Sequence, residues 1–345
     1  MIAETTRQER RRNSKKAEIV VPARQGFRLP KPIRRLQRQA PMYALQAVGS
    51  LSTRLRELTG RDVIDLGRIM EVAQFFYQQR ELAQRGPNYI VDDFGFDPKW
   101  TESFLIAFKA LYRDYWRVET TGVEHVPSSG RALLVANHAG VLPWDGTMIK
   151  TAVFSEHPNP RHVRALVASQ FMGMPTLSWF LRRTGQAVGH PDDTRRLLER
   201  DELVLVFPEG TRGTGKKFKD RYRLRRFGRG GFVATAIRAG APIIPISVVG
   251  SEEIYPMLAD LPPVARFLGL PYFPLTPFWP WLGPLGMIPL PSKWRIQFHA
   301  PVDVSHLEPK DAEDQHLVMA LADDVRDIIQ RGIYDNLRLR RGVFL

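Results

Sequence analysis

From residue 118 onward, the chain alternates short apolar runs, rich in valine, leucine and isoleucine, with stretches of helical periodicity. This alternation predicts an α/β fold, in which a central mixed, largely parallel sheet is flanked by helices. We expect strands over 132–136, 163–168, 203–207, 243–249 and 295–299, and helices over 146–154, 175–183, 231–239 and 311–331.

The residues before the predicted sheet favour helices. Apolar residues recur at helical spacing between 39 and 85, and a further helix is expected over 99–112. The fold prediction therefore includes an N-terminal helical segment. We divide the chain into a basic disordered tail (1–40), this helical segment (41–115), the α/β domain (116–310) and a C-terminal helix and tail (311–345).

Two polar loops each follow a predicted strand. The first carries Asn137, His138 and Asp145, and the second reads Phe-Pro-Glu-Gly-Thr-Arg from 207 to 212. In open α/β sheets, ligands gather beyond the carboxyl ends of the strands. The two loops therefore predict one active site.

Histidine titrates near neutral pH, so His138 is our candidate general base for removing a proton from a hydroxyl group. Asp145 is its candidate orienting partner, which would accept a hydrogen bond from the other ring nitrogen. Two alternatives stay open from the residues alone. Asp145 can cap the following helix, and His138 can be a structural histidine.

Together, the two loops resemble the glycerolipid acyltransferase family, whose members carry Asn-His followed by Asp and then Phe-Pro-Glu-Gly-Thr-Arg. The resemblance covers about residues 92–302. It implies transfer of a fatty acyl group from an acyl-coenzyme A or acyl carrier protein thioester to a glycerolipid hydroxyl, without a covalent enzyme intermediate. It implies no cofactor beyond the thioester co-substrate. No metal is expected, because the histidines show no paired spacing of the His-Glu-x-x-His kind.

The resemblance also implies roles for the second loop, in which Glu209, Gly210, Thr211 and Arg212 would bind substrate. An arginine fork suits the phosphates of coenzyme A or of the acceptor, and a plain surface position for Arg212 is the alternative. One departure concerns the first loop. Family members have four residues between His and Asp, whereas six intervene here, which puts the role of Asp145 in question.

A second departure concerns the acceptor. The family often has a phosphate-binding arginine where this chain reads Gly-Gln-Ala-Val-Gly-His-Pro from 185 to 191, so Arg195, Arg196 or His190 is the expected substitute. Lysophosphatidate remains the default acceptor, and a neutral glyceride is the alternative acceptor. Pro242 and Pro245 resemble the family motif that lines the acyl groove, and a plain strand entry is the alternative.

Lipid contact is expected at two places. The basic tail holds twelve lysines and arginines against three glutamates, in a chain of net charge +14, and such tails bind anionic head groups or nucleic acid or remain solvated. Segment 260–292 is rich in aromatic residues and contains nine prolines, a density that predicts no helix. It either faces lipid or is buried in the domain.

The chain contains no run of eighteen or more apolar residues, so we expect no membrane-spanning helix. We therefore expect a cytoplasmic, peripheral protein on the inner face of the plasma membrane. Its expected partners are the lipid surface, a lysophospholipid or glyceride acceptor and acyl-coenzyme A, without nucleic acid. A non-catalytic binder of membrane or nucleic acid is the alternative, and a P-loop-like nucleotide site at 210–216 is disfavoured because Lys217 stands where Ser or Thr is needed.

Overall fold

The computed structural model describes residues 19–20 and 90–344. The chain divides into two units, residues 1–107 and 108–345. Most of the predicted basic tail and the first predicted N-terminal helices lie outside the described residues, so these predictions remain untested. None of the described helices is long and apolar enough to cross a membrane.

The first unit contributes two short strands and the start of a helix. Strands β1 (Ile19–Val20) and β2 (Ile90–Val91) pair in antiparallel fashion. Helix α4 (Pro98–Ala110) starts at a proline, which is well tolerated at the first helical position. It continues as a π-helical turn, η1 (Leu111–Tyr115), which accounts for the predicted helix over 99–112 with slightly different bounds.

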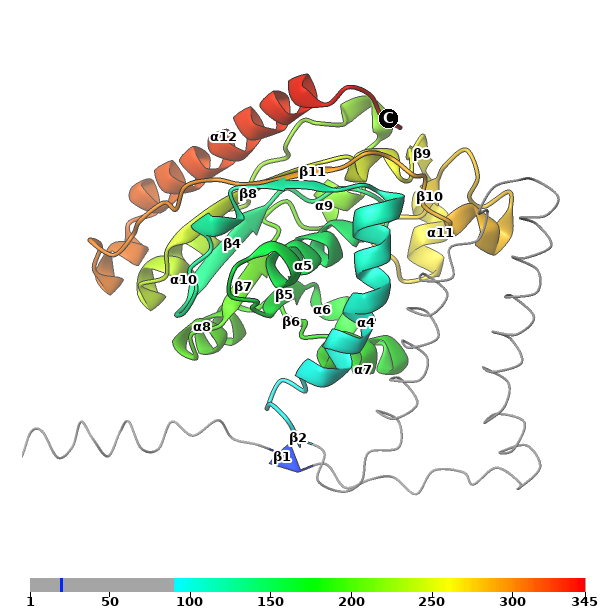
Figure 1. Cartoon of the computed structure of the whole chain (residues 1–345). Coiled ribbons are helices and arrows are strands. Elements are labelled where there is room, and N and C mark those ends of the chain that lie inside the picture. Colours follow the sequence, from blue (N-terminus) through cyan, green and yellow to red (C-terminus); the bar gives the residue numbers. More distant parts are fainter. Residues whose placement is uncertain (1–18, 21–89, 345) are drawn as a thin grey trace, which may run out of the picture. The chain divides into compact units, whose positions relative to one another are not determined.

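The second unit contains a seven-stranded sheet in the order β3-β11-β8-β4-β7-β5-β6. Every neighbouring pair is parallel except β8 and β11. The predicted mixed, largely parallel sheet is therefore confirmed (Figure 1). The strands are β3 (Glu119–Thr121), β4 (Ala132–Ala136), β5 (Val163–Val167), β6 (Ala187–Val188), β7 (Leu203–Val206), β8 (Ile243–Val249) and β11 (Arg295–Phe298).

Helices connect and flank these strands. They are α5 (Trp144–Glu156), α6 (Ser169–Met172), α7 (Pro175–Arg183), α8 (Pro191–Glu199), α9 (Thr211–Thr214), α10 (Gly231–Ala239), α11 (Pro262–Phe267) and α12 (Gln315–Leu339). Short 3-10 turns are η2 (Val123–His125), η3 (Phe218–Asp220), η4 (Ser251–Glu253), η5 (Gly283–Met287) and η6 (Pro309–Glu313). A separate pair of strands is β9 (Ala259–Asp260) and β10 (Pro274–Leu275).

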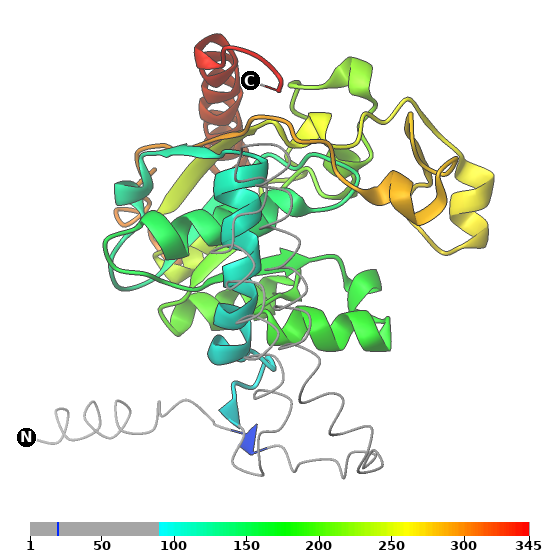
Figure 2. The same cartoon turned by 45° about the vertical axis from the view of Figure 1, so that its right-hand side comes forward.

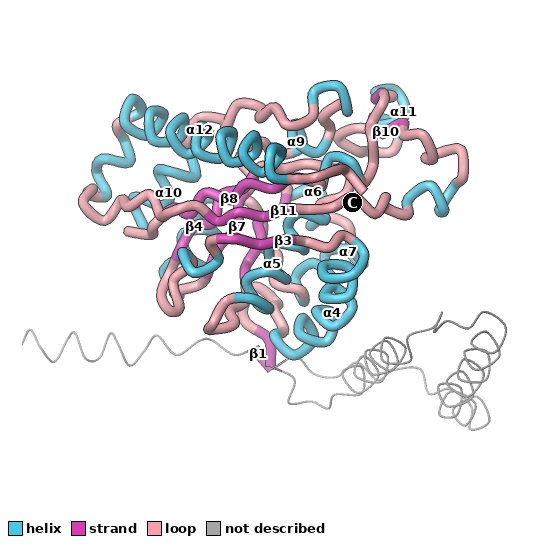
Figure 3. Tube along the Cα trace, turned by 45° about the horizontal axis from the view of Figure 1, so that its top comes forward, coloured by secondary structure: helices cyan, strands magenta, loops and turns pink. Residues whose placement is uncertain are grey.

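Alternate side chains of β8 point to opposite faces of the sheet, as the period of a strand requires. Ile246 and Val248 belong to the core cluster that includes Met148 of α5. Ser247, between them, donates a hydrogen bond from Oγ to the backbone oxygen of Ile329 in α12, at 2.9 Å. Helices α5 and α12 therefore cover opposite faces, and Figure 3 shows α12 lying across β8 and β11.

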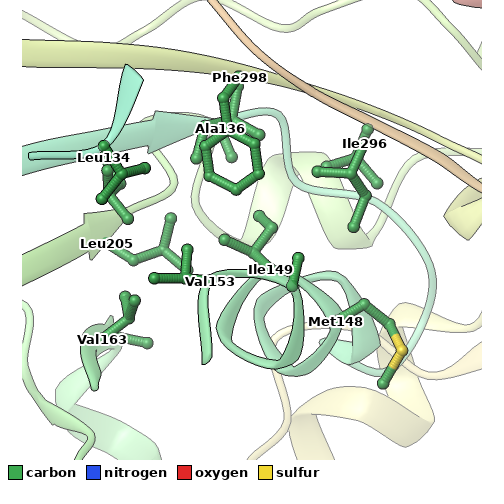
Figure 4. Packing of buried hydrophobic residues seen from close by; sticks show 14 of the residues in the cluster. Leu134, Ala136, Met148, Ile149, Val153, Val163, Leu205, Ile296 and Phe298 are labelled. Carbon is green, nitrogen blue, oxygen red and sulfur yellow. The ribbon is translucent and has the colours of Figure 1, made fainter. Parts of the chain in front are cut away.

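The core between the sheet and α5 is apolar and fully buried. Trp116 and Trp294 stack within it, with ring centroids 5.0 Å apart, and neither is exposed. Such close packing holds the strand ends, and the loops that follow them, in fixed positions. The members labelled in Figure 4 are Leu134, Ala136, Met148, Ile149, Val153, Val163, Leu205, Ile296 and Phe298.

The proline-rich segment between 261 and 291 contains short regular elements, so the prediction that no helix forms there is wrong. Helix α11 has prolines at its first positions, where the missing N–H groups would have no partner in the helix anyway. Strands β9 and β10 pair in antiparallel fashion on either side of α11. Figures 1 and 2 show these elements together at one side of the sheet.

Helix α12 differs from the predicted range of 311–331. It begins at Gln315 because the side chain of Asp314 accepts hydrogen bonds from the backbone N–H groups of His316 and Leu317. The preceding residues form the turn η6 instead. At its other end the helix continues through Gly332 to Leu339.

Candidate active site

The loop after β4 is fixed to the neighbouring strand by Asn137. Its amide nitrogen donates to the backbone oxygen of Val248 at 2.9 Å, and the backbone N–H of Val248 donates to Asn137 Oδ1 at 2.8 Å. The chain then turns at Gly140, where φ is +80° and a Cβ would lie 2.8 Å from the backbone oxygen of Ser251. Only glycine fits this turn without strain.

This turn brings Asp145 back to His138. The distance from His138 Nδ1 to Asp145 Oδ2 is 2.8 Å, and the Asp145 side chain is fully buried. The same oxygen accepts the backbone N–H of Ala139 at 2.8 Å. The six intervening residues therefore do not prevent the pairing. The capping alternative does not apply, because Asp145 is already inside α5 and Pro143 precedes the helix.

The other ring nitrogen of His138, Nε2, is available to accept a proton. An ionised carboxylate can only accept, so Nδ1 carries the proton and Nε2 keeps its lone pair. Within the described part of the chain, no hydrogen bond engages Nε2. The ring stacks on Phe207, with centroids 4.1 Å apart, and the side chain remains 14% exposed. The arrangement provides an oriented base that a substrate can reach.

Glu209 holds the histidine loop in place. Its Oε1 accepts the backbone N–H of His138 at 3.0 Å, and its Oε2 accepts the backbone N–H of Arg225 at 2.6 Å. The residue is only 1% exposed. We expected Glu209 to bind substrate, but the chain's own N–H groups occupy both of its carboxylate oxygens. This favours a positioning role over direct contact.

Lys216 is a site residue that the sequence interpretation missed. Its ammonium lies 3.4 Å from Glu209 Oε2 and 3.0 Å from Glu252 Oε1, with only 3% of the side chain exposed. It neutralises buried carboxylates and is not free to bind a nucleotide phosphate. The P-loop alternative is therefore wrong. No sequence signal links Lys216 to Glu252, because the two meet only in the fold.

The sequence interpretation also missed Gly213, in the short helix α9. A Cβ there would lie 2.6 Å from the backbone oxygen of His138 and 2.9 Å from Glu209 Cβ. Glycine is needed because the helix backbone packs directly against the histidine. A run of three glycines between 210 and 215 was the available signal.

Comparison with known proteins identifies this arrangement. A family model described as Acyltransferase matches residues 117–249, a range that holds His138, Asp145 and Glu209. An uncharacterised protein of Mycobacterium tuberculosis is 46% identical over 281 residues, which cover 81% of this chain and 77% of that protein. This chain belongs to the acyltransferase family. The resemblance read from the two loops is confirmed.

Other proteins are similar to this acyltransferase over different lengths. An uncharacterised protein of Mycobacterium leprae is 49% identical over 258 residues, covering 74% of this chain and 70% of that protein. The 1-acyl-sn-glycerol-3-phosphate acyltransferase alpha of Ovis aries is 31% identical over 159 residues, covering 44% of this chain and 50% of that enzyme. The crystal structure of a 1-acyl-sn-glycerophosphate acyltransferase from Thermotoga maritima aligns with a TM-score of 0.43 and 18% identity, covering 91% of this chain and 100% of that one.

The remaining residues of the second acyltransferase loop surround the start of α9. Gly210 has φ of +56° and precedes the helix, while Thr211 is its first residue. Arg212 is exposed. Unlike the carboxylate of Glu209, these groups are open to a substrate.

Four of the predicted site residues make no contact with His138 among the contacts that the structure describes. His190 caps α8 and lies 3.5 Å from Asp192, and Arg195 pairs with Glu199 at 2.7 Å on the surface of the same helix. Pro242 immediately precedes β8, at the end of the sheet opposite to His138, and Pro245 is buried inside that strand. This placement agrees with the strand-entry alternative for the two prolines.

A small, partly open pocket lies beside the histidine loop. The histidine loop contributes Gly140 and Val141 to its lining, and helix α9 contributes Gly213 and Thr214. Lys217 and Arg221 add positive charge. Among the described residues, no group of three or more histidine, aspartate or glutamate side chains is arranged to hold a metal ion.

Glu252 makes the stability of this region depend on pH. Burial raises its pKa to about 7 from an ordinary 4.5, although Lys216 opposes the shift. A raised pKa favours the protonated form in the folded state, so stability present at low pH is lost as pH rises from 4.5 through 7. Glu252→Gln should remove this loss, which reaches about 3 kcal/mol at most. Urea unfolding at about pH 5 and about pH 8 measures it.

The matched control is Glu313→Gln, because Glu313 is an exposed carboxylate outside the site. This variant should keep the wild-type difference between the two pH values. Equal pH dependence in wild type and Glu252→Gln would contradict the assignment to Glu252.

Proposed function

We propose that this acyltransferase moves a fatty acyl group from an acyl-coenzyme A or acyl carrier protein thioester to a hydroxyl of a glycerolipid. The observation that carries the proposal is the 2.8 Å hydrogen bond between His138 Nδ1 and Asp145 Oδ2, which leaves Nε2 as an oriented base. The enzyme needs no nucleophile of its own, because the acceptor hydroxyl attacks the thioester directly.

The proton follows a balanced route in this mechanism. Nε2 of His138 takes the proton from the acceptor hydroxyl as its oxygen attacks the thioester carbonyl carbon. The buried carboxylate of Asp145 stabilises the imidazolium that forms. The tetrahedral intermediate then collapses, the carbon–sulfur bond breaks, and the imidazolium returns the proton to the thiolate. The products are the ester and a free thiol.

Substrate binding is assigned to the second loop. We propose that Gly210, Thr211 and the exposed Arg212 contact the phosphates of the donor or acceptor, since a guanidinium fork suits phosphate geometry. Glu209 acts one step away, through its hydrogen bond to the backbone of His138.

The acceptor and the setting belong to the same proposal. The named activity of the Ovis aries relative motivates lysophosphatidate as the first acceptor to test. His190 and Arg195 pair with Asp192 and Glu199, and the family's phosphate-binding arginine is absent from 185–191, so a neutral glyceride is the second acceptor to test. We further propose a peripheral position on the inner face of the plasma membrane, with no resident cofactor and no bound nucleic acid.

Acceptor-dependent thiol release tests the proposal. Purified full-length chain is mixed with an acyl-coenzyme A and, in turn, lysophosphatidate, lysophosphatidylcholine, monoacylglycerol or diacylglycerol. We expect thiol release to rise with one acceptor class, and the esterified product to appear in equal amount. Replacing the donor by an acyl carrier protein thioester distinguishes the two donors. If no acceptor raises thiol release from either donor, the proposed function is wrong.

A further inference from the structure

The segment from 258 to 290, which we term the apolar flap, exposes a large amount of apolar surface. Phe267 is 88% exposed, Trp281 is 73% exposed and Leu285 is 68% exposed. Clusters of this kind mark interaction sites, because isolated exposed apolar residues are common but contiguous groups are not. The other exposed members are Leu258, Leu268, Leu270, Phe278, Leu282, Met287 and Ile288.

The flap keeps this surface exposed through its own backbone structure. Leu258 N donates to the oxygen of Leu275 at 2.8 Å, which joins the flap's two arms. Thr276 and Trp279 are bonded to each other twice, through backbone and hydroxyl groups. Tyr255 Oη, in the domain, donates to the oxygen of Met287 at 2.6 Å. The apolar side chains are therefore presented outward by a bonded framework.

A strongly basic loop, residues 217–229, lies against the base of the flap. The backbone N–H of Phe218 donates to the oxygen of Met257 at 2.8 Å, which joins the two segments directly. Further hydrogen bonds from the backbone of the loop to Glu252 and Glu209 fix its course. Its exposed cations are Lys217, Lys219, Arg223, Arg225, Arg226 and Arg229.

The combination selects one occupant. Tryptophan, phenylalanine and leucine suit the boundary between water and acyl chains, and lysine and arginine beside them attract anionic head groups. Nucleic acid would use the cations but not the apolar flap. A protein partner would be expected to meet a surface whose centre is depleted of charge, without a dense cationic loop at its edge. The flap and the basic loop together fit an anionic lipid surface.

The flap is also bonded to the catalytic loop. Tyr272 Oη donates to the backbone oxygen of Val141, between His138 and Asp145, at 2.7 Å. The ring of Tyr272 also packs against the end of α9, since a Cβ at Gly215, the residue after the helix, would lie 3.0 Å from the ring. A membrane held by the flap would therefore lie next to the site that needs a lipid acceptor.

We infer that the apolar flap inserts into the interfacial layer of an anionic bilayer while the basic loop contacts its head groups, so that His138 faces the lipid acceptor. The inference rests on the proposed function for the identity of the acceptor. Contact with the bilayer itself does not depend on turnover, so the two can fail separately.

Vesicle partitioning of the full-length chain tests the inference. The flap variant Phe267→Ser/Trp281→Ser/Leu285→Ser should partition about tenfold less onto vesicles of phosphatidylcholine and phosphatidylglycerol than wild type. The loop variant Lys219→Gln/Arg223→Gln/Arg226→Gln should lose binding chiefly on vesicles that contain phosphatidylglycerol. Added salt should lower the vesicle binding of the wild type toward the level of the loop variant.

A matched control distinguishes the effect of the flap residues from the effect of making any exposed apolar surface more polar. Tyr334→Ser/Leu339→Ser removes two exposed apolar residues of α12, 46% and 64% exposed, and should partition as wild type does. Equal partitioning of the flap variant and wild type would overturn the inference. A second result would also overturn it: without lipid, the wild type is a dimer and the flap variant is a monomer. The flap would then bind a second copy of the chain.

Two further measurements complete the test. With short-chain substrates below their micelle concentration, the flap variant should release thiol at the wild-type rate, since its site is intact. If thiol release from these monomeric substrates falls as much as vesicle binding does, the inference is overturned, because the flap would then contribute to the active site and not to bilayer binding. Tighter binding of the basic loop to duplex DNA than to anionic vesicles would also overturn it.

Discussion

Replacement of His138 by alanine is expected to lower acceptor-dependent thiol release by about a thousandfold, because the base that takes the hydroxyl proton is lost. The fold should survive the change. The ring is partly exposed and stacks on Phe207 at one face, so its loss opens no sealed cavity. Initial rates with saturating acyl-coenzyme A measure turnover, and circular dichroism melting measures the fold.

His190→Ala is the matched control for this prediction. His190 also lies near an aspartate, Asp192, but it is 62% exposed at the N-cap of α8, and no hydrogen bond or ion pair that the structure describes joins it to the catalytic loop. Its loss should leave turnover unchanged. If His138→Ala retains more than about a tenth of wild-type turnover with an unchanged melting curve, His138 is not the base.

Replacement of Asp145 by asparagine is expected to lower kcat by a factor on the order of a thousand. An asparagine amide can donate to Nδ1, which moves the ring proton to Nε2 and removes the lone pair that the reaction needs. The carboxylate that stabilises the imidazolium is lost at the same time. The rate should be measured at a temperature where the variant remains folded.

Asp145 also supports the loop, so stability must be measured beside the rate. Its oxygens accept the backbone N–H groups of Ala139 and Gly146, each at 2.8 Å, and an asparagine can satisfy only one of them with its single oxygen. We expect a stability loss of about 1–3 kcal/mol. Asp192→Asn, in the exposed pair on α8, should change neither quantity. A folded Asp145→Asn variant with wild-type kcat would show that the aspartate is only structural.

Much of the fold could be predicted from local pattern. The bounds predicted for β4, β8, α7 and α10 agree with those observed, because apolar runs, prolines and glycines mark these elements within a few residues of their ends. Local pattern was also sufficient to place both reactive loops after strands of a parallel sheet.

Where local pattern was wrong, a distant contact is the reason. Helix α12 was expected to end at 331, before Gly332, yet it continues through that glycine. A Cβ at Gly332 would lie 2.3 Å from Ser247 Oγ and 2.4 Å from His299 Nε2. The glycine allows the helix to pack closely on β8 and does not end it. Such a role cannot be recognised without knowing which strand the helix crosses.

The amino-acid sequence alone determined the α/β class, the two strand-end loops and the identity of His138 as the candidate base, because these depend on residues close together in the chain. The tertiary structure decided the rest. It showed that Asp145 reaches His138 across the turn at Gly140, that Glu209 holds the loop, and that Lys216 joins Glu209 to Glu252. These are contacts between separate segments, and their geometry is set by how the strands and helices pack.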